Sequence, residues 1–130
     1  MVVATIFTKI IRGEIPCHKI MENDDYLAFL DIRPINPGHT LVIPKIEIDY
    51  IFDLDDQILS GLLTFSKSVA IKIKKVVECH RIGIMVAGLE VPHAHVHLIP
   101  ITDIGDLNFA NAKPVAQDEL ARMAGLIKSA

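Results

Sequence analysis

Residues 55–77 carry the sequence pattern that most restricts how this chain can fold. Apolar side chains recur there at every third or fourth position, at Ile58, Leu62, Phe65, Val69, Ile73 and Val76. This spacing places them on one face of an α-helix, and the two aspartates at the start of the segment favour the positive end of the helix dipole. The pattern therefore predicts one long amphipathic helix that lies across another layer of structure.

Strand-like runs lie on both sides of this helix. Residues 18–22 and 26–32 are rich in β-formers and flank a polar turn, so they are expected to pair as a hairpin, and residues 39–43 follow as a further strand. Residues 81–87 and 94–99 flank a short connection and are expected to be neighbouring antiparallel strands. Together these runs predict a mainly antiparallel sheet of about five strands.

Shorter helices are expected towards both ends of the chain. Thr5 can cap a short helix before Gly13, in which the apolar residues with helical spacing are Ile6, Phe7, Ile10 and Ile11. Residues 114–128 repeat the helical spacing and predict a final helix, packed on the body of the protein or on a partner. The expected fold class is α+β, and the chain of 130 residues is expected to form a single domain, residues 1–130.

Composition and charge argue against several classes of protein. The net charge of −3 gives no general attraction to nucleic acid, and the lysines of the long helix are expected to form a solvated face. The apolar N-terminal run is too short for a membrane span, and basic residues follow it, whereas in a signal peptide they precede the apolar segment. Cys17 and Cys79 match neither a disulfide framework nor a metal-ligand pair. These features predict a soluble cytoplasmic protein with no nucleic-acid or membrane partner.

The sequence His93-Ala94-His95-Val96-His97 alternates histidines with apolar residues. On a strand, alternate side chains share a face, so the imidazoles would line one wall about 6.6 Å apart. An imidazole can serve as nucleophile, acid or base near neutral pH. From the residue types alone, three interpretations stay open: catalysis, a zinc site that would need further ligands, and buried structural histidines.

In its wider context this triad resembles the histidine triad (HIT) family. The similarity extends to the apolar residues around the histidines, to residues 38–45, to residues 6–16 and to residues 29–32, all in the family's order. The branch that the chain resembles most is that of the Hint-like nucleoside phosphoramidases. The resemblance implies that the protein hydrolyses nucleotide α-phosphate derivatives through a nucleotidylated histidine, without a metal or other cofactor, and that it forms a homodimer.

The resemblance assigns a role to each histidine of the motif. His95 is implied to be the nucleophile, while His93 and His97 hold and polarise the phosphate. His39, which taken alone would be a turn-end histidine, is implied to complete the polar cluster behind the phosphate. A nucleophilic imidazole must present an unprotonated nitrogen to phosphorus while an acceptor, such as the His93 carbonyl, anchors its other N–H.

Asp31 precedes a loop, residues 33–38, in which two prolines restrict the backbone and Gly38 can adopt a positive φ. Taken alone, Asp31 is explained equally well by a structural role as a turn or cap residue. The resemblance implies that its carboxylate holds the ribose hydroxyls through charge-assisted hydrogen bonds. By the same alignment six apolar residues would shape the slot for the base, although each could equally belong to the core: Ile6, Phe7, Ile10, Phe29, Ile32 and Leu41.

The chain departs from the family pattern in two places. Metal-binding relatives carry Cys-x-x-Cys in the opening helix, where this chain has Thr5 and Thr8, so no structural metal site is expected. The loop before the triad is shorter than in Hint-like proteins and places Glu90 where a hydroxyl residue is common. Glu90 is therefore included in the site as a residue that could favour an amine leaving group, with a solvent-facing role as the alternative. His18 and His80 match no motif residue and are expected to be surface or packing residues.

These expectations converge on hydrolysis of a purine nucleoside 5′-phosphoramidate, or a related nucleotidyl conjugate, to the nucleoside monophosphate. Two alternatives stay open. One is a dinucleoside polyphosphate hydrolase, which would need a groove for the second nucleotide. The other is a nucleotide-binding regulatory protein without turnover, which would release no monophosphate.

Overall fold

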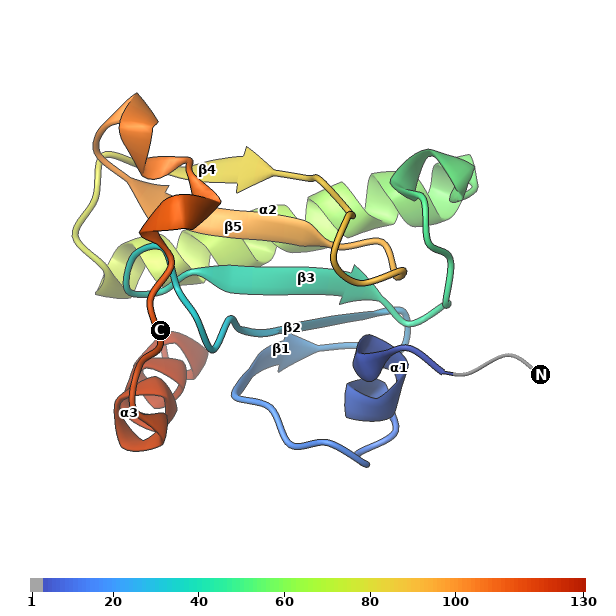
Figure 1. Cartoon of the computed structure of the whole chain (residues 1–130), viewed down its shortest axis with the longest axis horizontal. Coiled ribbons are helices and arrows are strands. Elements are labelled where there is room, and N and C mark those ends of the chain that lie inside the picture. The colour runs from blue at the N-terminus through green and yellow to red at the C-terminus, as the bar shows by residue number, and fades with distance from the viewer. Residues whose placement is uncertain (1–3) are drawn as a thin grey trace.

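The computed structural model describes residues 4–130 and contains a five-stranded sheet (Figure 1). The strands are β1 (Lys19–Glu22), β2 (Tyr26–Leu30), β3 (Thr40–Pro44), β4 (Arg81–Met85) and β5 (Val96–Ile101). They lie in the order β1-β2-β3-β5-β4, and every neighbouring pair is antiparallel. The expected hairpin, the number of strands and the α+β class are confirmed.

The α-helices of the described chain are α1 (Ile6–Ile11), α2 (Asp56–Val76) and α3 (Gln117–Lys128). Thr5 caps α1, because its hydroxyl accepts a hydrogen bond of 3.0 Å from the backbone N–H of Thr8. Asp55 caps α2 in the same way and accepts from the N–H of Ile58 at 2.8 Å. A cap of this kind stabilises a helix by about 1 kcal/mol. The three helices expected from the sequence spacing are confirmed.

α2 covers one face of the sheet and forms the main core with it (Figure 1). Buried residues of this core include Ala28, Val42, Val96 and Leu98 from the sheet and Leu62, Phe65, Val69 and Ile73 from α2. α3 packs against β1 and α2 and buries Leu120, Ala124 and Ile127. The final helix therefore lies on the body of the protein, which is one of its two expected positions.

α1 covers part of the opposite face, in front of the sheet in Figure 1. A second, smaller cluster joins its Phe7 to residues of β2 and β3, namely Leu27, Phe29, Leu41 and Ile43. Because side chains alternate along a strand, β2 and β3 contribute to both clusters, and all their residues are buried. His97 of β5 is paired with Leu41, so its side chain lies on the α1 face. The sheet thus directs His97 away from the main core.

The segment that carries the triad is less regular than expected. β5 begins only at Val96, so two of the three histidines precede it and only His97 lies in a strand. Pro92 has no N–H to donate to a ladder, and the N–H of Ala94 donates to the Ile48 carbonyl at 2.7 Å. The expected strand over residues 94–99 therefore begins two residues later than predicted, because contacts with a loop rather than with the sheet satisfy the backbone before Val96.

The loop between β2 and β3 packs closely against the end of α2. Gly38 has a φ of 92°, which only glycine adopts readily. A Cβ at this position would also press against Val77, which follows α2. The expected positive φ of Gly38 is confirmed, and the loop ends where β3 and the site begin.

The structure bears on the expectations about a membrane span and about the cysteines. Within residues 4–130, no helix is both long enough and apolar enough to cross a membrane. Cys17 and Cys79 are free and half-buried, as expected of cysteines that match no disulfide framework.

Candidate active site

A cavity of about 570 Å³ opens on the α1 side of the sheet. Its wall contains all but two of the residues assigned to the site from the sequence: Ile6, Phe7, Ile10, Phe29, Asp31, Ile32, Leu41, Glu90, His95 and His97. The two exceptions, His39 and His93, each hydrogen-bond to a histidine of the wall. The volume falls within the range of about 300–1,000 Å³ that is usual for small-molecule sites.

The apolar residues of this wall differ in their exposure. Phe7, Phe29 and Leu41 are buried and belong to the smaller core cluster. Ile6 and Ile32, in contrast, are 48% and 58% exposed. Large apolar side chains at the rim of a cavity offer a surface on which a flat ligand can pack.

His95 is held in one tautomer by the backbone of His93. The Nδ1 atom of His95 lies 2.7 Å from the His93 carbonyl oxygen, which can only accept a hydrogen bond, so Nδ1 carries the proton. The Nε2 atom is then unprotonated and keeps its lone pair. The ring of Phe7 contacts the imidazole edge-on, with 5.1 Å between ring centroids, and fixes its orientation from the α1 side.

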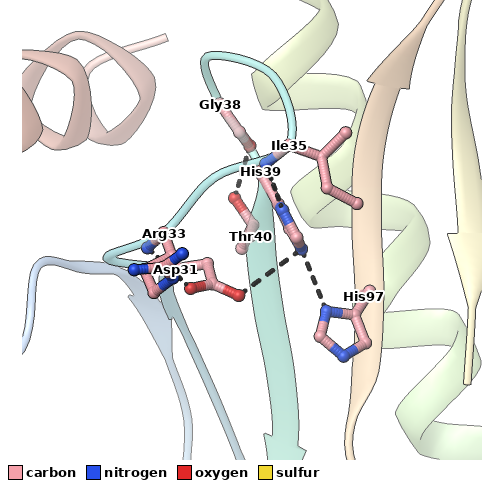
Figure 2. A network of polar contacts seen from close by, with 7 residues as sticks. All are labelled: Asp31, Arg33, Ile35, Gly38, His39, Thr40 and His97. Atoms are coloured by element: carbon pink, nitrogen blue, oxygen red, sulfur yellow. Dashed lines mark hydrogen bonds and ion pairs between the residues drawn. The ribbon is translucent and has the colours of Figure 1, made fainter. Parts of the chain in front are cut away.

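His97 is held in the opposite tautomer by a chain of hydrogen bonds through His39 (Figure 2). The backbone N–H of Ile35 donates to Nδ1 of His39 at 3.0 Å, so the proton of His39 must be on Nε2. This Nε2–H donates to Nδ1 of His97 at 2.9 Å, which leaves the proton of His97 on its own Nε2. His95 therefore keeps a lone pair on Nε2, whereas His97 carries an N–H there.

Burial keeps His39 and His97 neutral. It lowers the pKa of His39 to about 4. It also lowers the pKa of His97 to about 3, and the nearby His39 and His95 act in the same direction. At neutral pH both rings are therefore uncharged, which the hydrogen-bond chain requires, since a second proton on either ring would face another donor.

His93 has no ring nitrogen free for a ligand. Its Nε2–H donates to the Pro44 carbonyl at 2.8 Å, and its Nδ1 lies 3.0 Å from the hydroxyl of Thr5. The side chain is fully buried, and burial lowers its pKa. A direct contact between the His93 ring and the phosphate is therefore not part of the proposal below, because both nitrogens are already bonded inside the protein.

Asp31 stands between the loop and the cavity (Figure 2). One carboxylate oxygen accepts from the N–H of Arg33 at 2.9 Å, which is the turn contact expected of an aspartate before a loop. The other oxygen lies 3.7 Å from Nε2 of His39. Burial raises the pKa of Asp31, and the Arg33 hydrogen bond opposes that rise. The side chain thus combines a turn contact with a position on the cavity wall.

One hydrogen-bonded pair of residues on the cavity wall, His18 and Gln117, was missed by the sequence analysis. His18, expected to be a surface or packing residue, lines the cavity together with Gln117 of α3. Their side chains are 2.7 Å apart, from His18 Nε2 to Gln117 Oε1. No local sequence pattern could have found this pair, because 99 positions separate the two residues.

Among the described residues, Asp31, His39 and His97 form the group whose ligand atoms lie close enough to hold a metal ion, all within 4.8 Å of one another. A metal there would have to replace the proton that His39 donates to His97. The two threonines of α1, at the positions of the Cys-x-x-Cys pair, instead make hydrogen bonds to Glu47 and His93.

The sheet, the helix across it and the histidine-lined cavity define an α+β protein with a buried histidine cluster beside a ligand-sized cavity. A family model for the HIT domain matches residues 12–104. The chain therefore belongs to the HIT family.

Individual relatives agree with this assignment. The chain is 39% identical over 124 residues to an uncharacterised HIT-like protein of Methanocaldococcus jannaschii, covering 90% of this chain and 95% of that protein. It is 37% identical over 105 residues to the adenosine 5′-monophosphoramidase of Saccharomyces cerevisiae, covering 77% of this chain and 64% of the yeast protein. The crystal structure of a Hit-like protein from Bartonella henselae matches with a TM-score of 0.85 and 33% identity, over 96% of this chain and 94% of that one.

Proposed function

We propose that this protein is a nucleotide hydrolase in which Nε2 of His95 attacks the α-phosphorus of a purine nucleoside phosphoramidate or a related nucleotidyl conjugate. The observation that carries the proposal is the opposite protonation of neighbouring histidines. His95 offers a lone pair, and His97, whose ring centroid is 5.0 Å away, offers an N–H. The likeness to the yeast adenosine 5′-monophosphoramidase supports the class of substrate.

The chemistry proceeds in two displacements. The His95 lone pair forms a bond to phosphorus while the bond to the leaving group breaks, and an amine leaves with the electron pair of that bond and a proton taken from solvent water. Water then attacks phosphorus as the bond between phosphorus and His95 breaks, which releases the nucleoside monophosphate, restores the His95 lone pair and returns a proton to the solvent. In both steps the His97 N–H donates to a phosphoryl oxygen and stabilises its growing negative charge. The His93 carbonyl stabilises the positive charge that His95 acquires.

The nucleoside is proposed to occupy the rest of the cavity. Asp31 has a carboxylate oxygen on the cavity wall that can accept hydrogen bonds from the ribose hydroxyls. The exposed side chains of Ile6 and Ile32 would contact the flat base, and the buried Phe7 lines the same cavity. This assignment explains why apolar isoleucines remain exposed at this place.

The leaving group is proposed to extend towards a second cavity of about 470 Å³, which shares His95 with the first. Its wall includes two exposed aromatic residues, Tyr50 and Phe52, and one carboxylate, Asp49. Glu90 lies on the loop between the cavities. Two carboxylates and two aromatic rings favour an amine with an apolar body over an anionic polyphosphate.

One experiment tests the proposed function. The protein is mixed with an adenosine phosphoramidate, quenched, and analysed for released AMP and for a covalent adduct by mass spectrometry. We expect AMP release, an adduct on His95, and a loss of at least about 10³-fold in kcat for His95→Ala with nucleotide binding retained. An adduct on another residue would refute the mechanism. Binding without AMP release would favour a regulatory protein, and faster cleavage of diadenosine tetraphosphate would favour a polyphosphate hydrolase.

A further inference from the structure

Four polar side chains meet where α1 begins beside the buried His93. The hydroxyl of Thr8 donates to Oε1 of Glu47 at 2.6 Å, and the backbone N–H of Thr5 donates to the same oxygen at 2.9 Å. The hydroxyl of Thr5 lies 3.0 Å from Nδ1 of His93. The contacts join three distant parts of the chain: the start of α1, the segment after β3 and the segment before β5.

The direction of each hydrogen bond in this group is fixed by its two ends. The Pro44 carbonyl can only accept, so Nε2 of His93 carries the ring proton and Nδ1 is an acceptor. The Thr5 hydroxyl lies 3.0 Å from this acceptor and 3.3 Å from the Thr8 hydroxyl, so the shorter contact assigns its proton to Nδ1. Its oxygen accepts from the N–H of Thr8. At the other end, the Glu47 carboxylate can only accept, so the Thr8 hydroxyl must donate to it.

We propose that Thr5, Thr8 and Glu47 are positioning residues for catalysis: together with the Pro44 carbonyl they hold His93 in its Nε2–H tautomer, and thereby hold the carbonyl that orients His95. This inference rests on the proposed role of His95 as nucleophile. It gives His93 a function that needs no contact with the phosphate.

The physical reason lies in the packing around His93. With the proton on Nδ1 instead, the Nε2 lone pair would face the Pro44 carbonyl oxygen at 2.8 Å and the two acceptors would repel each other. The residue would have to move, and its carbonyl with it. That carbonyl is the acceptor for Nδ1–H of His95, so the lone pair of the nucleophile would lose its fixed direction. Phe7 contacts both imidazoles, which couples α1 to the same movement.

Three substitutions of Thr5 separate this role from simple helix capping. Thr5→Ser keeps both the cap and the hydroxyl donor, and Thr5→Val loses both. Thr5→Gly loses the donor but keeps most of the capping preference, because glycine is nearly as favourable as threonine at an N-cap. If the hydroxyl positions His93, Thr5→Gly should behave like Thr5→Val and not like Thr5→Ser.

Two measurements are made on each variant. Nitrogen-15 NMR of the histidine rings reports the His93 tautomer and the solvent exchange of the His95 Nδ1–H without any substrate. We expect Thr5→Val and Thr5→Gly to speed this exchange about tenfold and to lower kcat about tenfold, with KM for the nucleotide little changed, because Thr5 is not part of the cavity wall. Thr5→Ser should restore both values.

Glu47 gives an independent test at the other end of the group. Glu47→Ala removes the acceptor and should reproduce part of the Thr5→Val effect on exchange and on kcat. Glu47→Gln retains an acceptor oxygen and should give wild-type values of both. Glu14→Ala removes an exposed carboxylate that follows α1 and should leave both measurements unchanged.

The experiments distinguish failure of this positioning role from failure of the proposed function. If Thr5→Gly matches Thr5→Ser in exchange and in kcat, the hydroxyl acts only as a cap and the inference is refuted. Unchanged His95 exchange in Thr5→Val would refute it as well. If wild-type protein forms no nucleotidyl-histidine, the proposed function fails, but the NMR comparison still decides whether this group fixes His93.

Discussion

Nε2 of His39 donates a hydrogen bond of 2.9 Å to Nδ1 of His97, and this contact decides which proton His97 can offer to a ligand. The donor itself is fixed by the backbone N–H of Ile35, which occupies the other nitrogen of His39. A peptide group at the end of a proline-rich loop thus sets the protonation of a side chain in the cavity.

Replacing His39 by phenylalanine should lower kcat about a hundredfold, the usual effect of losing one donor to a developing negative charge. Without His39, the proton of His97 can move to Nδ1, and a lone pair would then face the phosphoryl oxygen. His39→Gln is the control, because its amide N–H can still donate to His97. Steady-state kinetics of both variants would check this, and equal rates for His39→Phe and wild type would contradict it.

Stability should depend on pH through the same two histidines. Burial lowers the pKa of His39 from 6.5 to about 4 and that of His97 from 6.5 to about 3. Between pH 6.5 and these lowered pKa values, the unfolded chain binds protons that the folded protein excludes. The free energy of unfolding is therefore highest, as far as these two groups are concerned, above pH 6.5, and it falls as the pH drops towards 4 and below. Urea denaturation across this range would measure the fall. His39→Gln should weaken the pH dependence, and an identical dependence in that variant would contradict the assignment.

Turnover should not require a metal ion. His95 needs a free lone pair for attack, and the threonines of α1 are already engaged in hydrogen bonds. A chelator should leave kcat unchanged. Added Zn²⁺ should slow the reaction, because Asp31, His39 and His97 could hold it only by giving up the proton between the two histidines. Stoichiometric zinc in the purified protein, with activity lost on its removal, would point to a metallohydrolase instead.

Glu90, which departs from the Hint-like pattern, should contribute to the preference for one leaving group over another. An ionised glutamate accepts from a protonated amine but repels an anionic polyphosphate. Wild type should therefore prefer an adenosine phosphoramidate with an alkylamine leaving group over diadenosine tetraphosphate, and Glu90→Gln should narrow that preference. The ratio of kcat/KM for the two substrates measures the effect. An unchanged ratio in Glu90→Gln would show that Glu90 is a bystander.

A homodimer is proposed to form through β4 and α2. β4 is an edge strand of the sheet, and apolar side chains lie exposed on it and on the neighbouring helix, including Ile84, Leu63 and Ile71. An exposed edge with apolar side chains favours association with a second copy. Light scattering at micromolar concentration should give a dimer, and Ile84→Lys should shift it to monomer. Ile104→Lys alters an isoleucine that is 82% exposed outside the sheet and should have no effect. A strictly monomeric, active wild type would contradict the proposal.

Much of the fold could be predicted because the signals are local. The apolar spacing of α2, the cap at Thr5 and the positive φ of Gly38 depend on neighbouring residues, and each agrees with the structure. The order of motifs along the chain was enough to assign the family. The same local reasoning failed at the triad, because Pro92 and the contact of Ala94 with Ile48 interrupt the strand that the alternation predicts.

The sequence by itself therefore determined the elements, the family and most residues of the cavity wall. Only the tertiary structure decided what each histidine can do. His39 and His97 are 58 positions apart, and His93 and Thr5 are 88 apart, yet these contacts place the ring protons. A free imidazole has nearly equivalent nitrogens, so its tautomer is set by the donor or acceptor that packing brings to it. For this reason the three histidines differ: His93 is buried with both ring nitrogens bonded, His95 has a lone pair on Nε2, and His97 has a hydrogen-bond donor there.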